Sequence, residues 1–183
     1  MNYYLDIKIL ADPEFSTVVL MNALYTKLHK TLSGSQATNI GVSFPKYQNV
    51  LGNRLRLHGT VEALDKLQSL DWIGPMKGYC QIGELLQVPP NAKFRTVSRK
   101  QPTMSPAKLR RLLKRGTITE EEAKNYKAKM FNAGLDDPYV ELVSGSNGHR
   151  HRRYIEFGPL LDSPIEGSFD QFGLSKTATI PWF

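Results

Sequence analysis

The sequence contains a single cysteine, Cys80, which excludes an intramolecular disulfide and a metal site built from several cysteines. We therefore expect a reducing, cytoplasmic setting, with Cys80 filling a small apolar space. No run of about 18 apolar residues is present, so no membrane-spanning helix is expected. Of the anionic partners considered below, we expect nucleic acid and no membrane. The first ten residues, MNYYLDIKIL, lack the basic and then apolar order of a signal peptide.

Several catalytic signatures are also missing. The sequence has no G-x-S-x-G, no Walker loop, no HExxH and no clustered carboxylates for two-metal phosphoryl transfer. If the protein cuts nucleic acid, the natural candidate is therefore a metal-free route through the RNA 2′-hydroxyl. That route needs a base for the hydroxyl proton, a group that orients the hydroxyl, and cations for the phosphate. We expect no metal and no cofactor.

Acidic residues are absent from one long stretch. Between Lys93 and Arg115 the chain places nine of its 24 Lys and Arg residues and no Asp or Glu. Elsewhere the composition is ordinary for a globular protein of 183 residues, with 40% apolar and 22% charged residues. A pI near 9.5 indicates an anionic partner, either nucleic acid or a lipid surface.

The first half of the chain predicts alternating strands and helices. In chain order we expect a strand, a helix, two strands, a helix and a strand, at residues 3–9, 13–32, 39–45, 54–60, 61–70 and 80–88. Asp12 is expected to cap the first helix, with Pro13 in its first position. The order is that of the ferredoxin-like, or RRM-like, βαββαβ fold.

The second half follows the break QVPPNAK. We expect a strand at 93–101, a helix that opens at Ser105-Pro106, a second helix to about residue 131, and strands at 139–144, 151–157 and 177–183. Gly116 stands where a helix C-terminus favours glycine, and Thr119 and Glu122 form a capping box. The predicted fold class is α+β: an N-terminal ferredoxin-like domain, 1–90, and a C-terminal α+β domain, 91–183, that bears an arginine-rich helix.

That basic helix, 106–115, separates leucines from cations. Leu109, Leu112 and Leu113 fall within one arc of the helical wheel. The opposite side presents Lys108, Arg110, Arg111, Lys114 and Arg115. Like charges at these spacings repel by a few tenths of a kcal/mol per pair, or about 0.2–0.5 kcal/mol. A solvated face is the alternative, but such a face normally includes acids, so we favour an anionic ligand such as nucleic-acid phosphates.

Arg99 and Gln101 lie two positions apart on a predicted strand, so their side chains point to the same side. Arginine can bond guanine bidentately and glutamine can bond adenine in the same way. The pair is therefore a candidate reader of adjacent purines. Because the A-form major groove is narrow, such reading would occur where the groove opens, at the end of a short stem.

Two of the four histidines lie on predicted regular elements. His29 borders the apolar stripe of the first helix, between Lys27 and Lys30; it is a candidate base, although a lone histidine there is more often structural. His58 alternates with Arg54 and Arg56 on a strand face that we expect to be exposed, and it is not favoured as catalytic.

The other two histidines, His149 and His151, belong to SGSNGHRHRR, a turn rich in Ser, Gly and cations that suits a phosphate. Its serines, Ser144 and Ser146, are otherwise ordinary turn residues. Periodicity alone does not say whether His29 meets Ser144.

Eight stretches together resemble the CRISPR RNA-processing endoribonuclease of the type I-F system, a repeat-hairpin-specific RAMP family, from end to end. They are YLDI (4–7), DPEF (12–15), KLH (27–29), IGVSFP (40–45), VSRKQ (97–101), LRRLLKR (109–115), GLSK (173–176) and PWF (181–183). The resemblance implies that an arginine-rich helix enters the major groove of the CRISPR repeat hairpin. It further implies metal-independent cleavage of pre-crRNA at the base of the stem, which leaves a 2′,3′-cyclic phosphate, and retention of the crRNA within a surveillance complex with other subunits.

The resemblance also assigns roles to individual residues. His29 matches the catalytic histidine, Ser144 the hydroxyl-orienting serine and Ser146 a second active-site serine. Arg99 and Gln101 match the purine readers. Two phosphate-binding arginines of the helix match Arg111 and Arg115, and His151 takes the place of a phenylalanine that stacks at the base of the stem.

Three departures from the family pattern qualify these roles. Leu112 and Gly116 replace two further helix arginines, so Lys108, Arg110 and Lys114 are expected to share the phosphate contacts. Phe172 replaces a tyrosine near the active site, which argues against an essential hydroxyl there.

The alternatives to an endoribonuclease are a non-catalytic subunit that binds the RNA hairpin and a protein that binds double-stranded DNA.

Overall fold

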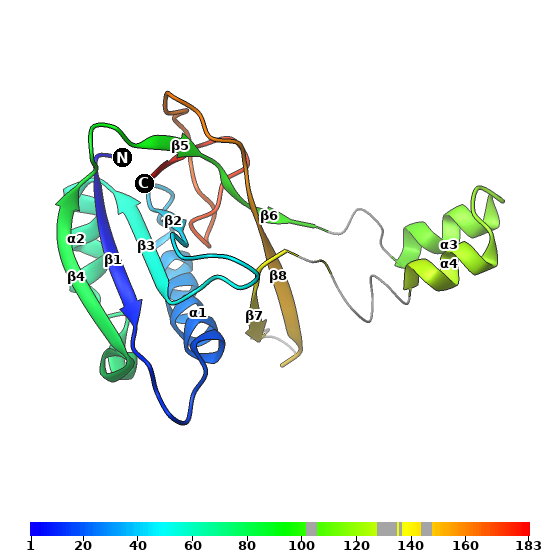
Figure 1. Cartoon of the computed structure of the whole chain (residues 1–183), viewed down its shortest axis with the longest axis horizontal. Coiled ribbons are helices and arrows are strands. Elements are labelled where there is room, and N and C mark those ends of the chain that lie inside the picture. Colours follow the sequence, from blue (N-terminus) through cyan, green and yellow to red (C-terminus); the bar gives the residue numbers. More distant parts are fainter. Residues whose placement is uncertain (102–105, 128–134, 136, 144–147) are drawn as a thin grey trace.

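The computed structural model describes residues 1–101, 106–127, 135, 137–143 and 148–183 (Figure 1). Its first part is one four-stranded sheet with two helices. The elements in chain order are β1 (Tyr3–Ile9), α1 (Thr17–Ser35), β2 (Gly41–Ser43), β3 (Arg54–Gly59), α2 (Val61–Ser69), the 3-10 helix η1 (Gly74–Tyr79) and β4 (Cys80–Gln87). The strand order is β2-β3-β1-β4, and all neighbours are antiparallel. This arrangement confirms the predicted ferredoxin-like order of elements.

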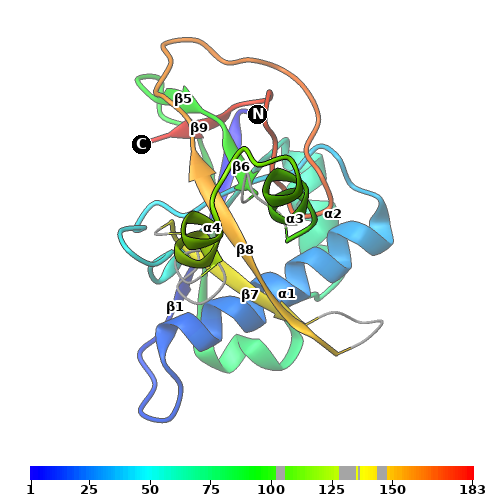
Figure 2. The same ribbon diagram turned by 90° about the vertical axis from the view of Figure 1, so that its right-hand side faces the viewer.

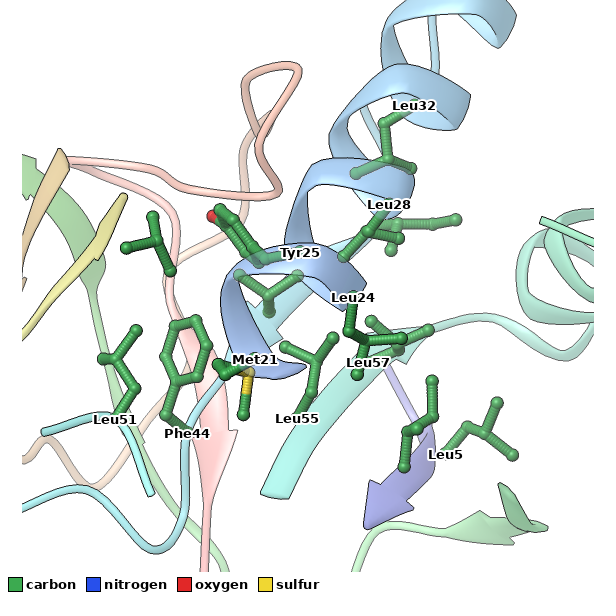
Figure 3. Close-up of a cluster of buried hydrophobic side chains, with 14 of the residues drawn as sticks. Leu5, Met21, Leu24, Tyr25, Leu28, Leu32, Phe44, Leu51, Leu55 and Leu57 are labelled. Atoms are coloured by element: carbon green, nitrogen blue, oxygen red, sulfur yellow. The ribbon is translucent and has the colours of Figure 1, made fainter. Parts of the chain in front are cut away.

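Alternating residues of β1 and β3 form the floor of the core. Leu5, Leu55 and Leu57 face the buried side of α1, where Leu24 and Leu28 have no exposed surface (Figure 3). The apolar residues repeat every two positions in the strands and about every 3.6 positions in the helix. Both repeats therefore place their side chains in one apolar layer between the sheet and α1. Each fully buried leucine contributes about 1.5–3 kcal/mol relative to an exposed one.

The first helix begins later than the sequence predicts. Its N-cap is Ser16, whose hydroxyl accepts from the Val19 N–H at 3.4 Å, so the expectation of a cap at Asp12 is wrong. The Asp12 carboxylate instead accepts from the Glu14 and Phe15 N–H groups, each at 2.9 Å, and closes a turn before the helix. Asp favours such turns for the same reason that it favours caps, which is why the sequence alone does not separate the two.

The second half contributes two small sheets. A two-stranded sheet pairs β5 (Lys93–Arg95) with β9 (Ile180–Trp182), and a three-stranded sheet has the order β6-β8-β7, from Val97–Lys100, Arg150–Phe157 and Tyr139–Val143. The predicted single strand at 93–101 is therefore wrong: it divides at Thr96, whose carbonyl accepts from the Gly158 N–H at 3.0 Å. Each piece then pairs in a different sheet.

The first sheet and the three-stranded sheet share a core. Buried Val140, Leu142 and Ile155 belong to the same hydrophobic cluster as the leucines of α1. The Glu141 N–H also donates to the Asn22 side-chain oxygen at 3.0 Å, which ties β7 to α1. The structure thus holds α1, on which His29 lies, against the second half of the chain.

Two short helices project from the three-stranded sheet, apart from the rest of the molecule (Figures 1 and 2). They are α3 (Pro106–Lys114) and α4 (Glu120–Lys127), and Leu109 and Ala123 are buried between them. Both local predictions here are confirmed. Gly116 ends α3 with a φ of 68°, and the Thr119 hydroxyl and Glu122 carboxylate cap each other's N–H groups at 3.2 and 2.8 Å.

Within the described part of the chain, no helix is long and apolar enough to cross a bilayer. Cys80 is buried, as expected of a small apolar filler, and this burial raises the pKa of its thiol.

Candidate active site and nucleic-acid interface

His29 lies on α1 and is held by a hydrogen bond to a turn near the end of the chain. Its Nδ1 donates to the Gln171 carbonyl oxygen at 3.0 Å. A carbonyl oxygen can only accept, so Nδ1 must carry the proton. In the neutral ring the second nitrogen, Nε2, then keeps its lone pair. This tautomer is the one that a general base requires.

The His29 ring is also fixed by stacking. It lies parallel to the Phe172 ring, with the centroids 3.6 Å apart and the planes at 9°. The Arg153 guanidinium carbon lies 3.4 Å from the same Phe172 centroid. Two groups so close to one centroid cannot share a face, so Phe172 is sandwiched between the imidazole and the guanidinium.

The turn that carries Gln171 and Phe172 is specified by its neighbours. The Asp170 carboxylate accepts from the Phe172 and Leu174 N–H groups at 2.8 and 3.0 Å. Gly173 has a φ of 68°, and a Cβ there would lie 2.6 Å from a methyl carbon of Val42. Only glycine satisfies both conditions without strain, which gives a physical reason for the glycine of the GLSK stretch.

Tyr25 supports this turn from one helical turn before His29. Its hydroxyl donates to the Phe172 carbonyl oxygen at 2.7 Å, and the side chain has no exposed surface. Burial, and then the nearby Asp170 charge, raise the pKa of Tyr25 far above its ordinary value. The hydroxyl therefore stays protonated and remains a donor. Tyr25 is not among the site residues predicted from the sequence, although its spacing of four from His29 places both on one helix face.

A hollow of about 410 Å³ adjoins this stack. Its polar lining consists of Arg99, Gln101, Arg153, Ser168, Asp170, Ser175 and Lys176. Arg99 of β6 and Gln101, which directly follows the strand, line the same hollow. Arg99 pairs in register with Ile155 of β8, two residues from Arg153, so the two arginines are diagonal neighbours across the sheet.

The cations of α3 lie elsewhere, on the outlying helix pair. Four of them are exposed, and within the described ranges none of the four forms an ion pair: Arg110, Arg111, Lys114 and Arg115. Lys108 is half-buried beside them. The leucine arc behaves as predicted, because Leu109 is fully buried and Leu112 and Leu113 are half-buried.

Three predicted site residues belong to the stretch SGSNGHRHRR, residues 144–153. Ser144 and Ser146 lie outside the described residues. His151 is described and lies exposed near the start of β8, opposite Leu142 of β7. The structure thus brings His29 together with Phe172 and Arg153, and it brings Arg99 together with Gln101.

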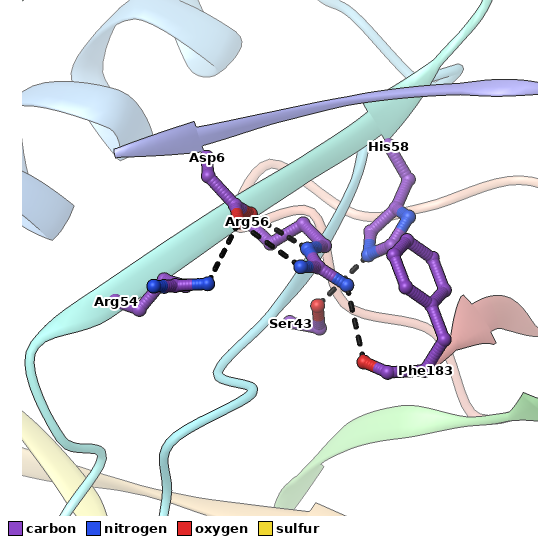
Figure 4. A network of polar contacts seen from close by, with 6 residues as sticks. All are labelled: Asp6, Ser43, Arg54, Arg56, His58 and Phe183. Carbon is purple, nitrogen blue, oxygen red and sulfur yellow. Dashed lines mark hydrogen bonds and ion pairs between the residues drawn. The ribbon is translucent and has the colours of Figure 1, made fainter. Parts of the chain in front are cut away.

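One prediction about β3 is wrong. The face that carries Arg54, Arg56 and His58 is not exposed, since Arg56 is 5% and His58 0% accessible. Asp6 of β1 pairs with Arg56 at 2.6 Å, and the Phe183 carbonyl accepts from Arg56 at 3.3 Å (Figure 4). The C-terminal strand therefore covers a face that the alternation of polar residues assigned to solvent.

His58 is a structural residue within that covered face. Its Nε2 shares a hydrogen bond with the Ser43 hydroxyl at 2.8 Å. Burial, and then the charges of Arg56 and the N-terminus, lower the pKa of His58 well below its ordinary value. A closed environment of this kind offers no access to a substrate, so the low priority given to His58 agrees with its position.

Among the described residues, no group of three or more His, Cys, Asp or Glu side chains is placed to hold a metal ion. The His29 ring contacts the Gln171 carbonyl oxygen and the Phe172 ring, and the Arg153 guanidinium lies against the other face of Phe172. The fold and the site together define a ferredoxin-like α+β protein with a buttressed histidine, a cationic hollow and an outlying basic helix.

Comparison with known proteins identifies the family. The family described as CRISPR-associated protein (Cas_Csy4) matches residues 4–183. Two curated relatives are each named CRISPR-associated endonuclease Cas6/Csy4. The one from Escherichia coli (strain UTI89 / UPEC) is 42% identical and the one from Pseudomonas aeruginosa (strain UCBPP-PA14) is 40% identical, and both alignments cover 100% of each chain. The chain belongs to the Cas_Csy4 family of CRISPR-associated proteins, which confirms the resemblance read from its sequence.

A more distant similarity is to a solved structure described as "Structure A of CRISPR endoribonuclease Cse3 bound to 19 nt RNA". It has a TM-score of 0.36 and 15% identity, and the alignment covers 97% of this chain and 100% of that one.

Proposed function

We propose that this protein is an endoribonuclease that binds the CRISPR repeat hairpin and cleaves pre-crRNA at the base of the stem. Cleavage proceeds by attack of the 2′-hydroxyl on the adjacent phosphate, without a metal or cofactor, and leaves a 2′,3′-cyclic phosphate and a 5′-hydroxyl. The full-length identity to relatives named endonucleases supports the reaction class. The observation that carries the mechanism is the state of His29.

In this mechanism His29 takes the proton of the attacking hydroxyl. The Gln171 carbonyl holds the proton on Nδ1, so Nε2 is the acceptor. Stacking on Phe172 restricts the ring to one plane, which removes orientational freedom before the substrate binds. A positioned base of this kind contributes about 10² to 10⁴ in rate. We assign Ser144 to orientation of the 2′-hydroxyl and Ser146 to the same site.

Recognition is divided between the hollow and α3. Arg99 and Gln101 read purine edges, and their shared hollow supports this pairing. Lys108 and the exposed cations of α3 bind phosphates of the stem, and His151 stacks at its base. We propose a division at about residue 90 between the ferredoxin-like domain with His29 and the C-terminal RNA-binding domain, and retention of the crRNA with other subunits of a type I-F surveillance complex.

The test is incubation with the repeat RNA from the CRISPR array of the same genome, with and without EDTA, followed by analysis of product ends. We expect one cut at the base of the stem, cyclic phosphate ends and no effect of the chelator. Complete inhibition by EDTA, restored by added Mg²⁺, would contradict the mechanism. Tight binding without cleavage would instead indicate a non-catalytic hairpin-binding subunit, and equal affinity for a DNA hairpin would indicate a DNA-binding protein.

A further inference from the structure

Arg153 is a buried cation whose Nε has no hydrogen-bonding partner among the described residues. The residue is 8% accessible, and this Nε is itself buried. Within the described residues its guanidinium forms no ion pair, and its central carbon lies 3.4 Å from the centroid of the Phe172 ring. Buried arginines are almost always paired, because an unpaired buried charge is strongly unfavourable.

The charges around Arg153 do not compensate it. Arg99 and Lys176 line the same hollow, and neither has an ion pair within the part of the chain that the structure describes. Asp170 is the one carboxylate among the lining residues, and one of its oxygens already accepts from two backbone N–H groups. Burial, and then the Arg99 charge, lower the pKa of Arg153, while Tyr25 and Asp170 act in the opposite direction.

The hollow is also a built feature of the fold. Arg153 is held on β8, and its diagonal neighbour Arg99 is held on β6. The Ser175 N–H donates to the Val97 carbonyl at 2.9 Å, which ties the segment bearing Lys176 to the start of β6. Three cations from three segments therefore line one opening.

We propose that Arg153, with Lys176, binds a backbone phosphate of the RNA in this hollow, beside the base that Arg99 reads. The proposal rests on the proposed function and adds a phosphate site to it. Gln101 beside Arg99 places the hollow next to the bases that these residues read. The Phe172 ring separates Arg153 from His29, so the bound phosphate neighbours the scissile linkage and is not the phosphate that is attacked.

This site also explains the order of the stack. A phosphate bound to Arg153 neutralises the guanidinium on one side of Phe172, while His29 faces the reacting linkage on the other. RNA binding then stabilises Arg153, and through it the ring against which His29 is packed. Arg153 is in this sense both a phosphate ligand and a positioning residue for His29.

The test combines substitutions with single neutral phosphates. All hairpin RNAs carry a 2′-deoxy nucleotide at the cleavage site, which prevents cutting. In a series of such RNAs, each carries a single methylphosphonate, at a different position around the base of the stem. Affinity is measured for the wild type, Arg153→Leu and Lys176→Ala, with Lys66→Ala on α2 as a control of equal charge change away from the hollow. Salt dependence is measured for the unmodified hairpin.

We expect Arg153→Leu and Lys176→Ala each to weaken hairpin binding by about 5- to 30-fold and to reduce the salt slope by about one, as loss of one phosphate contact does. At one methylphosphonate position the substitution should weaken binding by the wild type. The same methylphosphonate should not weaken binding by Arg153→Leu any further, because that variant has already lost the phosphate contact. Lys66→Ala should change affinity by less than about twofold.

Two results would overturn the inference. The first is that Arg153→Leu and Lys176→Ala both bind the hairpin with wild-type affinity. The second is that, at every methylphosphonate position, the losses of affinity caused by Arg153→Leu and by the methylphosphonate add together. Lys176 is exposed, so its variant keeps the test valid if Arg153→Leu fails to fold. Failure of the wild type to bind the hairpin would reject the proposed function as well, whereas normal binding with unaffected variants would reject this site alone.

Discussion

Two arginine clusters of this molecule are almost equally buried and have opposite surroundings. In the closed cluster, Asp6 pairs with Arg54 and Arg56, and Arg56 is 5% accessible. In the open cluster, Arg99, Arg153 and Lys176 line a hollow, and Arg153 is 8% accessible and has no paired carboxylate among the residues that the structure describes. In the first cluster the buried arginine has a carboxylate partner in the folded chain, and in the second we propose that an RNA phosphate is the partner.

Since Arg56 and Arg153 are similarly buried, burial alone does not separate a structural arginine from a ligand-binding one. Arg56 has the rings of Tyr4 and Phe183 at 4.5 and 4.0 Å, so aromatic contact is also common to both clusters. What distinguishes them is a carboxylate within hydrogen-bonding distance. Removing groups from each cluster should therefore affect stability in one case and RNA binding in the other.

The largest effect is expected from Asp6→Ala. This change leaves Arg56 buried without its partner, which typically costs about 3–5 kcal/mol. Urea unfolding measures the loss, with exposed Asp65→Ala on α2 as the control, for which we expect less than about 0.5 kcal/mol. A loss below about 1 kcal/mol for Asp6→Ala would remove the distinction between the clusters.

Gly173→Ala tests the turn that joins the open cluster to His29. The added Cβ meets Val42 and the backbone is left-handed, so we expect a loss of about 1–3 kcal/mol in stability and slower cleavage. Gly116→Ala is the matched control. It has the same φ of 68° but open space around the Cβ, so its cost should be smaller and cleavage unchanged. Equal cleavage rates for both variants would contradict the role of the turn.

Arg99→Ala tests base reading in the open cluster. Loss of a bidentate contact should weaken hairpin binding by about 1–3 kcal/mol and relax the preference at one base pair. Arg111→Ala on α3 should instead weaken binding to all sequences equally and flatten the salt slope. Binding to hairpins with a swapped base pair separates the two. An Arg99→Ala protein that still rejects the swap would contradict the assignment.

The closed cluster should also show in the pH dependence of stability. Because the folded pKa of His58 is far below its ordinary value, unfolded His58 binds a proton below about pH 6.5 and folded His58 does not. The His58 contribution is complete above that pH and falls by about 1.4 kcal/mol per unit below it. Urea titrations at pH 7, 6 and 5 measure the slope. His151→Ala, an exposed control, should retain it, whereas a flat profile would contradict the burial of His58.

The smallest effect is expected for the stability of Arg153→Leu. Removing an unpaired buried charge should change the unfolding free energy by less than about 1 kcal/mol, or increase it. Arg56→Leu should be much less stable, because it leaves Asp6 with Arg54 alone. A severe loss for Arg153→Leu in the absence of RNA would show that its cation serves the fold.

Local features of the fold were predictable from the sequence. Gly116 and the Thr119–Glu122 box depend on contacts within four residues, and the βαββαβ order depends on periodicity. The division of the strand 93–101 was not predictable, because it depends on pairing with β8 and β9, which are far away in sequence.

The candidate site divides in the same way. His29, Arg99 and Gln101 were proposed from residue type, spacing and family resemblance, and those roles stay predictions. The contacts of His29 with Gln171 and Phe172, and of Phe172 with Arg153, join residues more than 100 positions apart or on different elements. No periodicity connects them, so the covered face of β3 and the open cluster appear only when the chain folds.

The proposed role of His29 as the general base is tested by the single-turnover rate of hairpin cleavage by His29→Ala. The affinity of this variant for an uncleavable hairpin is measured in parallel. The account predicts a rate reduced by at least about 10² to 10⁴, with affinity within about threefold of the wild type. Cleavage at the wild-type rate by His29→Ala would contradict it.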